Sequence, residues 1–428
     1  MPTRRAAVLG GNRIPFARSN GRYAHAGNQD LLTATLDGLA ARFNLQGQRL
    51  GEVAAGAVLK HSRDFNLTRE SVLGSALSAE TPAYDVQQAC GTGLETTVLV
   101  ANKIALGQIE VGIAGGVDTT SDAPIAVSEG LRAVLLEANR ARSAGARLKA
   151  LTGLRPGQLV PEIPRNSEPR TGLSMGEHQA VTTAEWAISR QQQDELAVAS
   201  HRNLAAAYDR GFFTDLITPF LGLSRDENLR PDSSLEKLTK LKPVFGTGLP
   251  DPTMTAGNST PLTDGASAVL LSSDEWAAEH GLPVLAHLVD AETGAVDYVH
   301  GDRKDSGLLM APVYALPRLL ERNKLGLRDF DFYEIHEAFA ATVLTTLQAW
   351  ADPRFCAERL GLDQPLGTID PDKLNVAGSS LAAGHPFAAT GGRIVATLAK
   401  LLHEKGSGRG LISICAAGGQ GVVAILEV

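Results

Sequence analysis

The chain has 428 residues, of which 43% are apolar and 20% charged, and its formal net charge is −7. This composition is typical of a soluble globular protein of two or three domains, and it excludes fibrous and disordered chains. Because no domain-wide basic excess is present, nucleic acid is not expected as a partner.

The number of cysteines and the N-terminal residues indicate the cellular compartment in which the protein is expected. Three cysteines in a chain of this length do not form a disulfide framework, so a reducing, cytoplasmic location is expected. The N-terminal segment "MPTRRAAVLGGNRIPF" starts basic, but its apolar part is too short for a signal peptide and predicts a first β-strand. No apolar run approaches the ~18–20 residues of a membrane span.

Apolar runs bounded by glycine alternate along the chain with segments of helical periodicity. Strands are expected near residue 6 ("AAVLG") and at 111–116, 267–273, 331–340 and 410–419. Helices are expected at 96–106 and 392–403, and a further helix ends at Gly211 with Ser189 as its cap. This alternation predicts an α/β fold with largely buried strands.

Two segments resemble each other. Residues 92–116 and 390–419 both read as Thr-Gly, an apolar-periodic helix, a polar turn, an apolar strand and a final Ala-Gly-Gly. One copy starts just after Cys90 and the other just after His385. The repeat predicts two related half-domains that bring two reactive loops to a shared centre.

Residues 122–262 differ from the rest of the chain in composition: the segment is basic at first and then rich in proline and glycine. We interpret it as an insertion between the two halves. Three interpretations of its basic run stay open: contacts to ligand phosphates, contacts to an anionic membrane surface, or a solvated helix face. The run comprises Arg140, Arg142, Arg147 and Lys149.

Cys90, in "DVQQACGTGLETT", lies between small residues at the expected start of a helix. A helix N-terminus lowers the pKa of a thiol, and a thiolate attacks carbonyl carbon. Gly91 and Gly93 would leave room for a substrate beside the sulfur. The alternative is a buried and inert cysteine.

Three further residues could take part in acyl chemistry. His385, between glycine and proline, could act as the base for the thiol. Cys415 ends an apolar strand at a glycine-rich turn whose N–H groups could hold an oxyanion. His336, with Glu337, could polarise a carbonyl or orient a water. Each of the three could also be structural, and Cys356 has no such setting.

Taken together, the segments resemble the thiolase family over nearly the whole chain. The motifs "QQACGTG", "GGVDTTS", "TAGNSTPLTDGASA", "HEAFA", "GHPFAATGGR" and "CAAGGQG" follow one another in family order. The resemblance implies two βαβαβαββ halves in a five-layered α-β-α-β-α sandwich with an inserted loop domain. The implied boundaries are 1–121 with 263–283 for the N-terminal half, 122–262 for the loop domain and 284–428 for the C-terminal half.

The resemblance also implies a mechanism. Cys90 would attack the keto carbon of a 3-ketoacyl-CoA while His385 takes its proton, and Cys415 would protonate the acetyl-CoA carbanion. Coenzyme A would then remove the acyl group as a second substrate, with no prosthetic group or metal. The backbone amides of Cys90 and Ala417 would form one oxyanion site. His385 and His336 would serve the other.

This sequence departs from the commoner family form at two places. His336 stands where that form has asparagine, which resembles the degradative branch, including the thiolase subunit of trifunctional fatty-acid oxidation complexes. Ser174 stands where many relatives have histidine, although Met175 would still line the thioester pocket. Ser259 and Thr260 are the other expected coenzyme A contacts.

We therefore expect an acyltransferase that performs thiolysis in fatty-acid β-oxidation. The alternatives are an acetoacetyl-CoA thiolase that condenses two acetyl-CoA molecules, a non-catalytic acyl-CoA-binding subunit, and a β-ketoacyl synthase. The resemblance predicts a homodimer or homotetramer. A hydratase/dehydrogenase partner subunit and association with a membrane surface are further open expectations.

Overall fold

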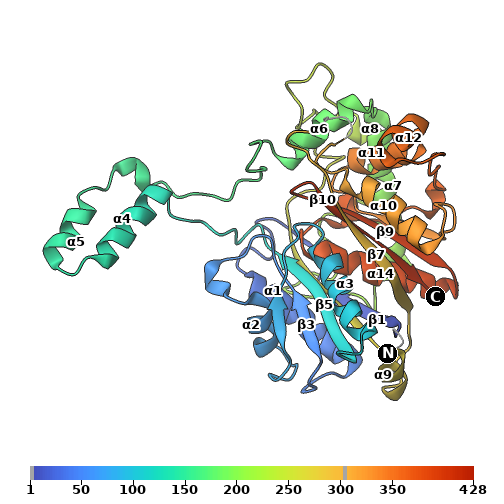
Figure 1. Cartoon of the computed structure of the whole chain (residues 1–428), viewed down its shortest axis with the longest axis horizontal. Coiled ribbons are helices and arrows are strands. Elements are labelled where there is room, and N and C mark those ends of the chain that lie inside the picture. Colours follow the sequence, from blue (N-terminus) through green and yellow to red (C-terminus); the bar gives the residue numbers. More distant parts are fainter. Residues whose placement is uncertain (1–3, 302–305) are drawn as a thin grey trace. The chain divides into compact units, whose positions relative to one another are not determined.

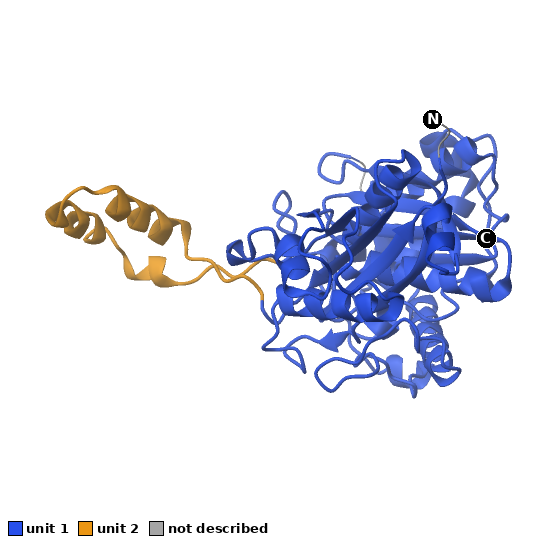
Figure 2. Ribbon diagram, turned by 90° about the horizontal axis from the view of Figure 1, so that it is seen from below, with its two compact units in different colours: residues 1–122, 167–428 blue, residues 123–166 orange. Residues whose placement is uncertain are grey.

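The computed structural model describes residues 4–301 and 306–428, and the chain divides into two compact units. One unit consists of Met1–Asp122 with Ser167–Val428, and the other of Ala123–Asn166 (Figure 2). Every residue expected to take part in chemistry belongs to the larger unit.

The first half of the larger unit forms a mixed sheet in the order β4-β3-β5-β6-β1. Its strands are β1 (Ala6–Arg13), β3 (Glu52–Ala55), β4 (Ala83–Asp85), β5 (Val111–Asp118) and β6 (Thr263–Ser272), with the short β2 (Ala17–Arg18) on β6. Strand β3 is parallel to β4 and β5, whereas β6 is antiparallel to both β5 and β1.

The second half repeats this pairing. Its order β7-β10-β9-β8 matches β1-β6-β5-β3, again with two antiparallel pairs followed by one parallel pair. The strands are β7 (Ala286–Ala295), β8 (Phe332–Ile335), β9 (Arg409–Ala416) and β10 (Gln420–Glu427). Strand β4 has no counterpart among the described strands of this half, and β1 joins the two sheets by pairing with β7. The prediction of two related halves is confirmed.

Helices cover both faces of each sheet. Helices α1 (Asn28–Phe43) and α2 (Leu67–Gly74) cover one face of the first sheet, and α10 (Ala311–Asn323), α11 (Ala340–Ala351) and α12 (Pro353–Leu360) accompany the second (Figure 1). Helices α3 (Thr92–Ala105) and α14 (Ala389–Lys405) share one apolar core with strands of both sheets.

The strand side chains show why the layers form. Along β1, Val8 belongs to the central core, whereas Ala7 and Leu9 belong to the core under α1. Along β9, Ile412 packs centrally and Leu411 packs in the outer core with α10. Because both faces are covered, these strands read as continuous apolar runs. The predicted five-layered sandwich is therefore confirmed.

The contact between α3 and α14 depends on glycine. A Cβ at Gly93 would lie 2.6 Å from the carbonyl oxygen of Ala388, and one at Gly391 would lie 2.1 Å from the backbone nitrogen of Leu94. Both distances are shorter than real Cβ atoms allow, so the glycines let the two backbones touch. The expectation that Gly93 clears space for a substrate is wrong, because its missing side chain serves this contact.

Five more helices complete the larger unit. They are α6 (Met175–Glu185), α7 (Arg190–Asp209), α8 (Leu235–Leu238), α9 (Asp274–Glu279) and α13 (Ser380–Ala383). The predicted cap of α7 is confirmed, since the Ser189 side chain accepts a hydrogen bond from the Gln192 backbone.

Strands β5 and β6, on either side of the insertion in the sequence, are antiparallel neighbours in the sheet. The predicted domain boundaries stay a proposal.

The smaller unit, Ala123–Asn166, is a helical hairpin. Helices α4 (Glu129–Arg140) and α5 (Ala144–Leu151) pack on each other, and a bridge between Ala126 and Glu162 brings the ends of the unit together. Ser128 and Ser143 cap the two helices by accepting backbone hydrogen bonds. Among the described residues, none of the helices combines the length and apolar character needed to cross a lipid bilayer.

Candidate active site

Cys90 lies between β4 and the start of α3, as the sequence predicts. Gly91 caps the helix, and Ala89 has a positive φ of 47°, a conformation that L-residues rarely adopt. Strained backbone of this kind persists where surrounding structure enforces it. Here the strain places the Cys90 sulfur at the helix N-terminus.

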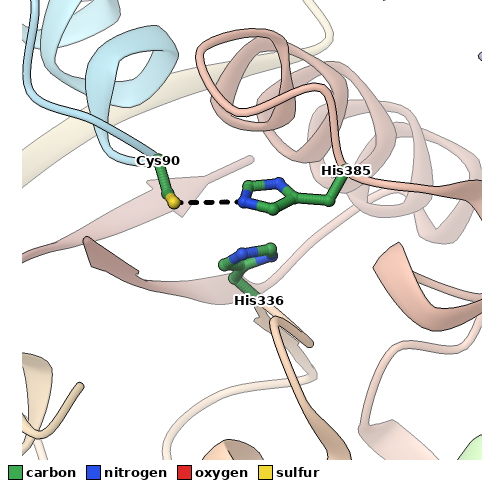
Figure 3. A group of neighbouring side chains, drawn as sticks. All are labelled: Cys90, His336 and His385. Carbon is green, nitrogen blue, oxygen red and sulfur yellow. Dashed lines mark hydrogen bonds between the residues drawn. The ribbon is translucent and has the colours of Figure 1, made fainter. Parts of the chain in front are cut away.

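His385 lies between α13 and α14, at the equivalent position of the second half. Its Nε2 is 3.1 Å from Cys90 Sγ, and its Nδ1 is 2.6 Å from Thr390 Oγ1 (Figure 3). Its backbone nitrogen donates to Thr263 Oγ1 at 3.1 Å. When Thr390 accepts the Nδ1 proton, the Nε2 lone pair is free to accept the thiol proton. The geometry therefore fits a thiol and its general base.

Burial keeps this pair neutral. It raises the pKa of the Cys90 thiol to about 12, although hydrogen bonds from the Ala417 and Cys90 backbone amides act in the opposite direction. It also lowers the pKa of His385 to about 3. The expectation that the helix N-terminus ionises this cysteine is wrong for the empty site, because the loss of hydration outweighs the amide contacts. The thiol is therefore neutral in the empty site and would have to lose its proton before or during any attack on a substrate.

Cys415 ends β9 and is 4% exposed. Burial, followed by the neighbouring Cys90, raises the pKa of its thiol, so it is protonated at rest. The turn after it contains Gly418 and Gly419, both with positive φ. Within this turn the Ala417 amide hydrogen-bonds the sulfur of Cys90. A second proton donor and a backbone amide thus meet at the nucleophile.

His336 follows β8 directly and packs against His385, with ring centroids 4.1 Å apart (Figure 3). Its Nδ1 is 2.9 Å from Ser380 Oγ, whereas its buried Nε2 has no partner. Burial, followed by the neighbouring His385 and Arg393, holds the pKa of His336 well below its usual value. A neutral imidazole therefore presents Nε2 in the neighbourhood of Cys90 and His385.

Glu337 is structural rather than reactive. Its carboxylate accepts hydrogen bonds from Ser200 Oγ at 2.7 Å, Asn375 Nδ2 at 2.8 Å and the Leu381 backbone nitrogen at 3.1 Å. These bonds tie α7 and the 375–381 segment to the end of β8. Its expected part in polarising a carbonyl is wrong, because these donors hold both of its oxygens.

Comparison with known proteins places this geometry in a family. Residues 6–275 match the model of the thiolase N-terminal domain, and residues 289–428 match that of the thiolase C-terminal domain. The chain belongs to the thiolase family. The 3-ketoacyl-CoA thiolase of Pectobacterium carotovorum is 40% identical over 99% of this chain and 97% of its own length. That of Yersinia pestis is 39% identical with the same coverage.

Solved structures agree with this assignment. Human mitochondrial 3-ketoacyl-CoA thiolase superposes with a TM-score of 0.81 at 28% identity, covering all of both chains. The Bacillus anthracis acetyl-CoA acetyltransferase gives the same score and identity, with 100% of this chain and 99% of that one covered. Overall shape therefore does not separate a 3-ketoacyl-CoA thiolase from an acetyl-CoA acetyltransferase, whereas the curated sequences that are 39–40% identical are named 3-ketoacyl-CoA thiolase.

Several polar residues that support this thiolase site have no assignment in the sequence interpretation. Asp118, fully buried at the end of β5, accepts from the Val58 and Leu59 amides through Oδ1 and from the Ala388 amide through Oδ2. Burial raises the pKa of its carboxyl to about 7. Asp118 thereby ties the start of α14 to the first half. Its position in "GGVDTTS", at a strand end, is the signal that could have found it.

Glu168 supports the turn after Cys415. Its Oε1 accepts from the Gly418 amide at 2.7 Å and its Oε2 from the Tyr298 hydroxyl at 2.8 Å, and the side chain is buried. Ala417, which precedes Gly418 in this turn, carries the backbone amide that contacts the Cys90 sulfur. No local pattern predicts this carboxylate, because its partners are distant in the chain.

The expected coenzyme A contacts differ in their surroundings. Met175 opens α6 and packs in the apolar cluster that includes Cys415. The Thr260 hydroxyl donates to the carbonyl oxygen of Ala338 at 2.9 Å, so toward a ligand it could only accept. The Ser259 hydroxyl is buried, has no partner and lines a cavity of about 460 Å³. These roles stay predictions.

Cys90, His336 and His385 also meet the geometric requirement for a metal site. One ligand atom from each lies within 4.8 Å of the others, and they form the one such group found in the described part of the chain. Thiolate and imidazole are donors that Zn²⁺ prefers, but the ion would occupy the same sulfur and nitrogen that acyl transfer uses. That no metal resides here stays a prediction.

Cys356 lies in α12, where its thiol donates to the carbonyl oxygens of Ala349 and Trp350. The side chain is fully buried among residues of the outer core of the second half. None of these partners belongs to the site, which agrees with its interpretation as a spectator.

Proposed function

We propose that this thiolase cleaves 3-ketoacyl-CoA with coenzyme A, giving acetyl-CoA and an acyl-CoA shortened by two carbons. The single observation that carries the proposal is the 3.1 Å contact between Cys90 Sγ and His385 Nε2, made next to the protonated thiol of Cys415. Coenzyme A acts as a substrate.

In the first half-reaction, Cys90 Sγ bonds to the keto carbon as His385 Nε2 takes the thiol proton. The tetrahedral intermediate collapses by breaking the bond between the α and β carbons. The electron pair stays on the α carbon of acetyl-CoA, and the Cys415 thiol protonates it. Acyl-Cys90, an imidazolium and a Cys415 thiolate remain.

The second half-reaction restores the site. The Cys415 thiolate takes the proton of incoming coenzyme A, whose sulfur attacks the acyl carbon on Cys90. Cys90 leaves as a thiolate and recovers its proton from the His385 imidazolium. Each residue ends in its starting state, and the two thiols have different tasks: one bonds carbon and the other moves a proton.

Oxyanion stabilisation is assigned to donors that already face the sulfur. The amides of Cys90 and Ala417 both hydrogen-bond Cys90 Sγ in the empty site, which supports them as the donors for one oxyanion. We assign the other site to His385 and His336, whose rings lie side by side.

The 460 Å³ cavity is the proposed entrance for coenzyme A. Its lining includes Ser259 and the guanidinium side chains of Arg18 and Arg230, with Leu241 and Leu381 as apolar residues. Buried polar atoms without partners are costly, so the Ser259 hydroxyl favours a polar ligand group. Two cationic side chains suit a ligand that carries phosphates.

The test is kcat/KM with C4, C8 and C16 3-ketoacyl-CoA. If the chain is a 3-ketoacyl-CoA thiolase of fatty-acid β-oxidation, we expect turnover of the C8 and C16 substrates. Turnover of the C4 substrate alone would contradict the degradative assignment and favour an acetoacetyl-CoA thiolase.

A non-catalytic acyl-CoA-binding subunit is separated by trapping the intermediate. Incubation with acetyl-CoA should place an acetyl group on Cys90, detected by mass spectrometry of the peptide. Binding without acylation would contradict the enzymatic assignment. Assembly as a homodimer or homotetramer and pairing with a hydratase/dehydrogenase subunit stay predictions, which analytical ultracentrifugation and co-purification would test.

Association with an anionic membrane surface is a second candidate, favoured by the helical hairpin Ala123–Asn166. The basic residues Arg140, Arg142, Arg147 and Lys149 are all exposed in it. Large apolar side chains are exposed in the same unit, among them Ile125, Leu148, Leu159, Val160 and Ile163. Exposed apolar residues next to basic ones suit an anionic lipid surface.

The test is flotation with vesicles that contain phosphatidylserine, compared with vesicles of phosphatidylcholine alone. We expect binding to the anionic vesicles only, weakened by Arg142→Glu with Arg147→Glu. Arg22→Glu, an exposed site in the larger unit, is the control. Equal binding by the variant and the parent would exclude the basic run as the contact.

A further inference from the structure

A buried serine, Ser380, connects His336, the histidine that follows β8, to a buried arginine, Arg393. Ser380 Oγ is 2.9 Å from His336 Nδ1 and accepts a hydrogen bond from Arg393 Nη2 at 3.1 Å. All three side chains are at most 4% exposed. No other hydrogen bond to this hydroxyl occurs among the described residues.

Proton counting decides the direction of the bond between Ser380 and His336. A guanidinium only donates, so Ser380 Oγ is an acceptor toward Arg393 and its single hydrogen needs another acceptor. Among the described residues the one other partner of this hydroxyl is His336 Nδ1, which must then be the acceptor. If Nδ1 carried a proton instead, the serine hydrogen would be buried without a partner, which is unfavourable.

We propose that Ser380 and Arg393 are positioning residues that hold His336 in the tautomer with its proton on Nε2. His336 then donates Nε2–H directly to the carbonyl oxygen of the substrate, beside Cys90 and His385. The inference rests on the proposed thiolysis and deepens it, because it assigns the proton of the residue that replaces asparagine in the commoner family form.

The opposite tautomer would work against the reaction. It would present the Nε2 lone pair to an oxygen that gains negative charge in the transition state, where a donor is needed. His336 Nε2 is buried and has no partner in the empty site, as expected of a donor reserved for a ligand. His385 uses the reverse arrangement, with Thr390 on Nδ1 and its Nε2 lone pair toward the thiol.

The surroundings of Arg393 keep it in place as a donor. Its guanidinium also donates to Ser379 Oγ at 3.1 Å, and the charges that act on it are those of Glu334, Glu337, Asp226 and Arg13. Ser379 therefore shares the arginine without touching His336, which makes it a matched control for Ser380.

The first experiment is a double-mutant cycle. Ser380→Ala should lower kcat by about tenfold to a hundredfold with little change in KM, whereas Ser379→Ala should leave kcat within about threefold. In the His336→Asn background, Ser380→Ala should have almost no further effect on kcat, because an asparagine has no tautomer to fix. An equal loss in both backgrounds, or equal losses from the two serine variants, would overturn the proposal.

The second experiment reads the tautomer in the parent itself and leaves Ser380 and Arg393 unchanged. In the parent with ¹⁵N-labelled histidine, the resonances missing from His336→Asn identify His336. Nε2 should give the chemical shift of a protonated ring nitrogen, and Nδ1 that of an unprotonated acceptor. The reverse pattern would overturn the proposal. This readout is independent of turnover, so a failure of the proposed thiolysis would be recognised separately, by inactivity of the parent.

Discussion

The two halves of the larger unit share a framework and differ in the polar side chains they contribute. Strand pairing is the same in both, and each half places a reactive loop directly before a central helix, α3 or α14. In the proposed mechanism the first half contributes one reacting side chain, Cys90, and the second half contributes His385, Cys415 and His336. The second half also holds the buried charged side chains of Arg393, Glu334 and Glu337. Duplication thus supplies the geometry, and the unequal polar residues supply the chemistry.

The largest test of this comparison removes the contribution of the first half. Cys90→Ala should lower kcat by about 10⁴-fold or more, because the proposed covalent intermediate forms on this sulfur. Acyl-CoA binding, measured by calorimetry, should remain. Cys356→Ala is the control for loss of a thiol and should keep nearly full turnover. Substantial turnover by Cys90→Ala would refute the covalent route.

Cys415→Ala separates the two thiols and should have the next largest effect. Loss of the proton donor should lower the rate of C–C cleavage by about 10²- to 10³-fold. Exchange of labelled coenzyme A into acyl-CoA breaks no C–C bond. In the variant His385 can take the Cys90 proton and pass it to the departing coenzyme A thiolate, so this exchange should fall much less. Steady-state thiolysis and isotope exchange measure the two steps, and parallel losses would mean that the thiols share one task.

Glu168→Gln tests the support of the turn after Cys415. A glutamine is uncharged: its Oε1 accepts from the Gly418 amide less strongly than a carboxylate oxygen does, and its Nε2 can only donate to the Tyr298 hydroxyl. We therefore expect kcat to fall by about tenfold as Ala417 shifts from Cys90. Tyr298→Phe keeps the Gly418 bond and should cost less than about threefold. If Tyr298→Phe lowers kcat as much as Glu168→Gln does, the hydrogen bond from the Gly418 amide to Glu168 is not what holds the turn.

The last test concerns Glu334, a buried carboxyl that interacts with the Arg393 guanidinium, and measures how the free energy of unfolding depends on pH. Burial raises the pKa of Glu334 to about 8, above its unfolded value, so the folded chain binds the extra proton between about pH 4.5 and pH 8. Relative to Glu334→Gln, the parent should lose unfolding free energy as pH rises through this range, by at most about 1.4 kcal/mol per pH unit. Urea titrations at pH 5 and pH 8 measure it, and a pH-independent difference would show that Glu334 stays in one charge state.

The sequence predicts the sandwich and three reacting residues because each lies in a local motif at an element boundary. It could not predict their protonation, since a helix N-terminus is visible in the sequence but burial depends on the opposing half. Gly93 illustrates the same limit, because its neighbours come from α14. Ser380 lies within a quoted stretch, yet its role emerges only when α13 docks between His336 and Arg393.

The backbone contact between α3 and α14 has a consequence for how such proteins change over time. The separation between the Cys90 sulfur and the His385 nitrogen depends on two helices that meet without intervening side chains, at Gly93 and Gly391. A single added methyl group at either position would push nucleophile and base apart. A substitution at either glycine therefore has to be accommodated by both halves at once.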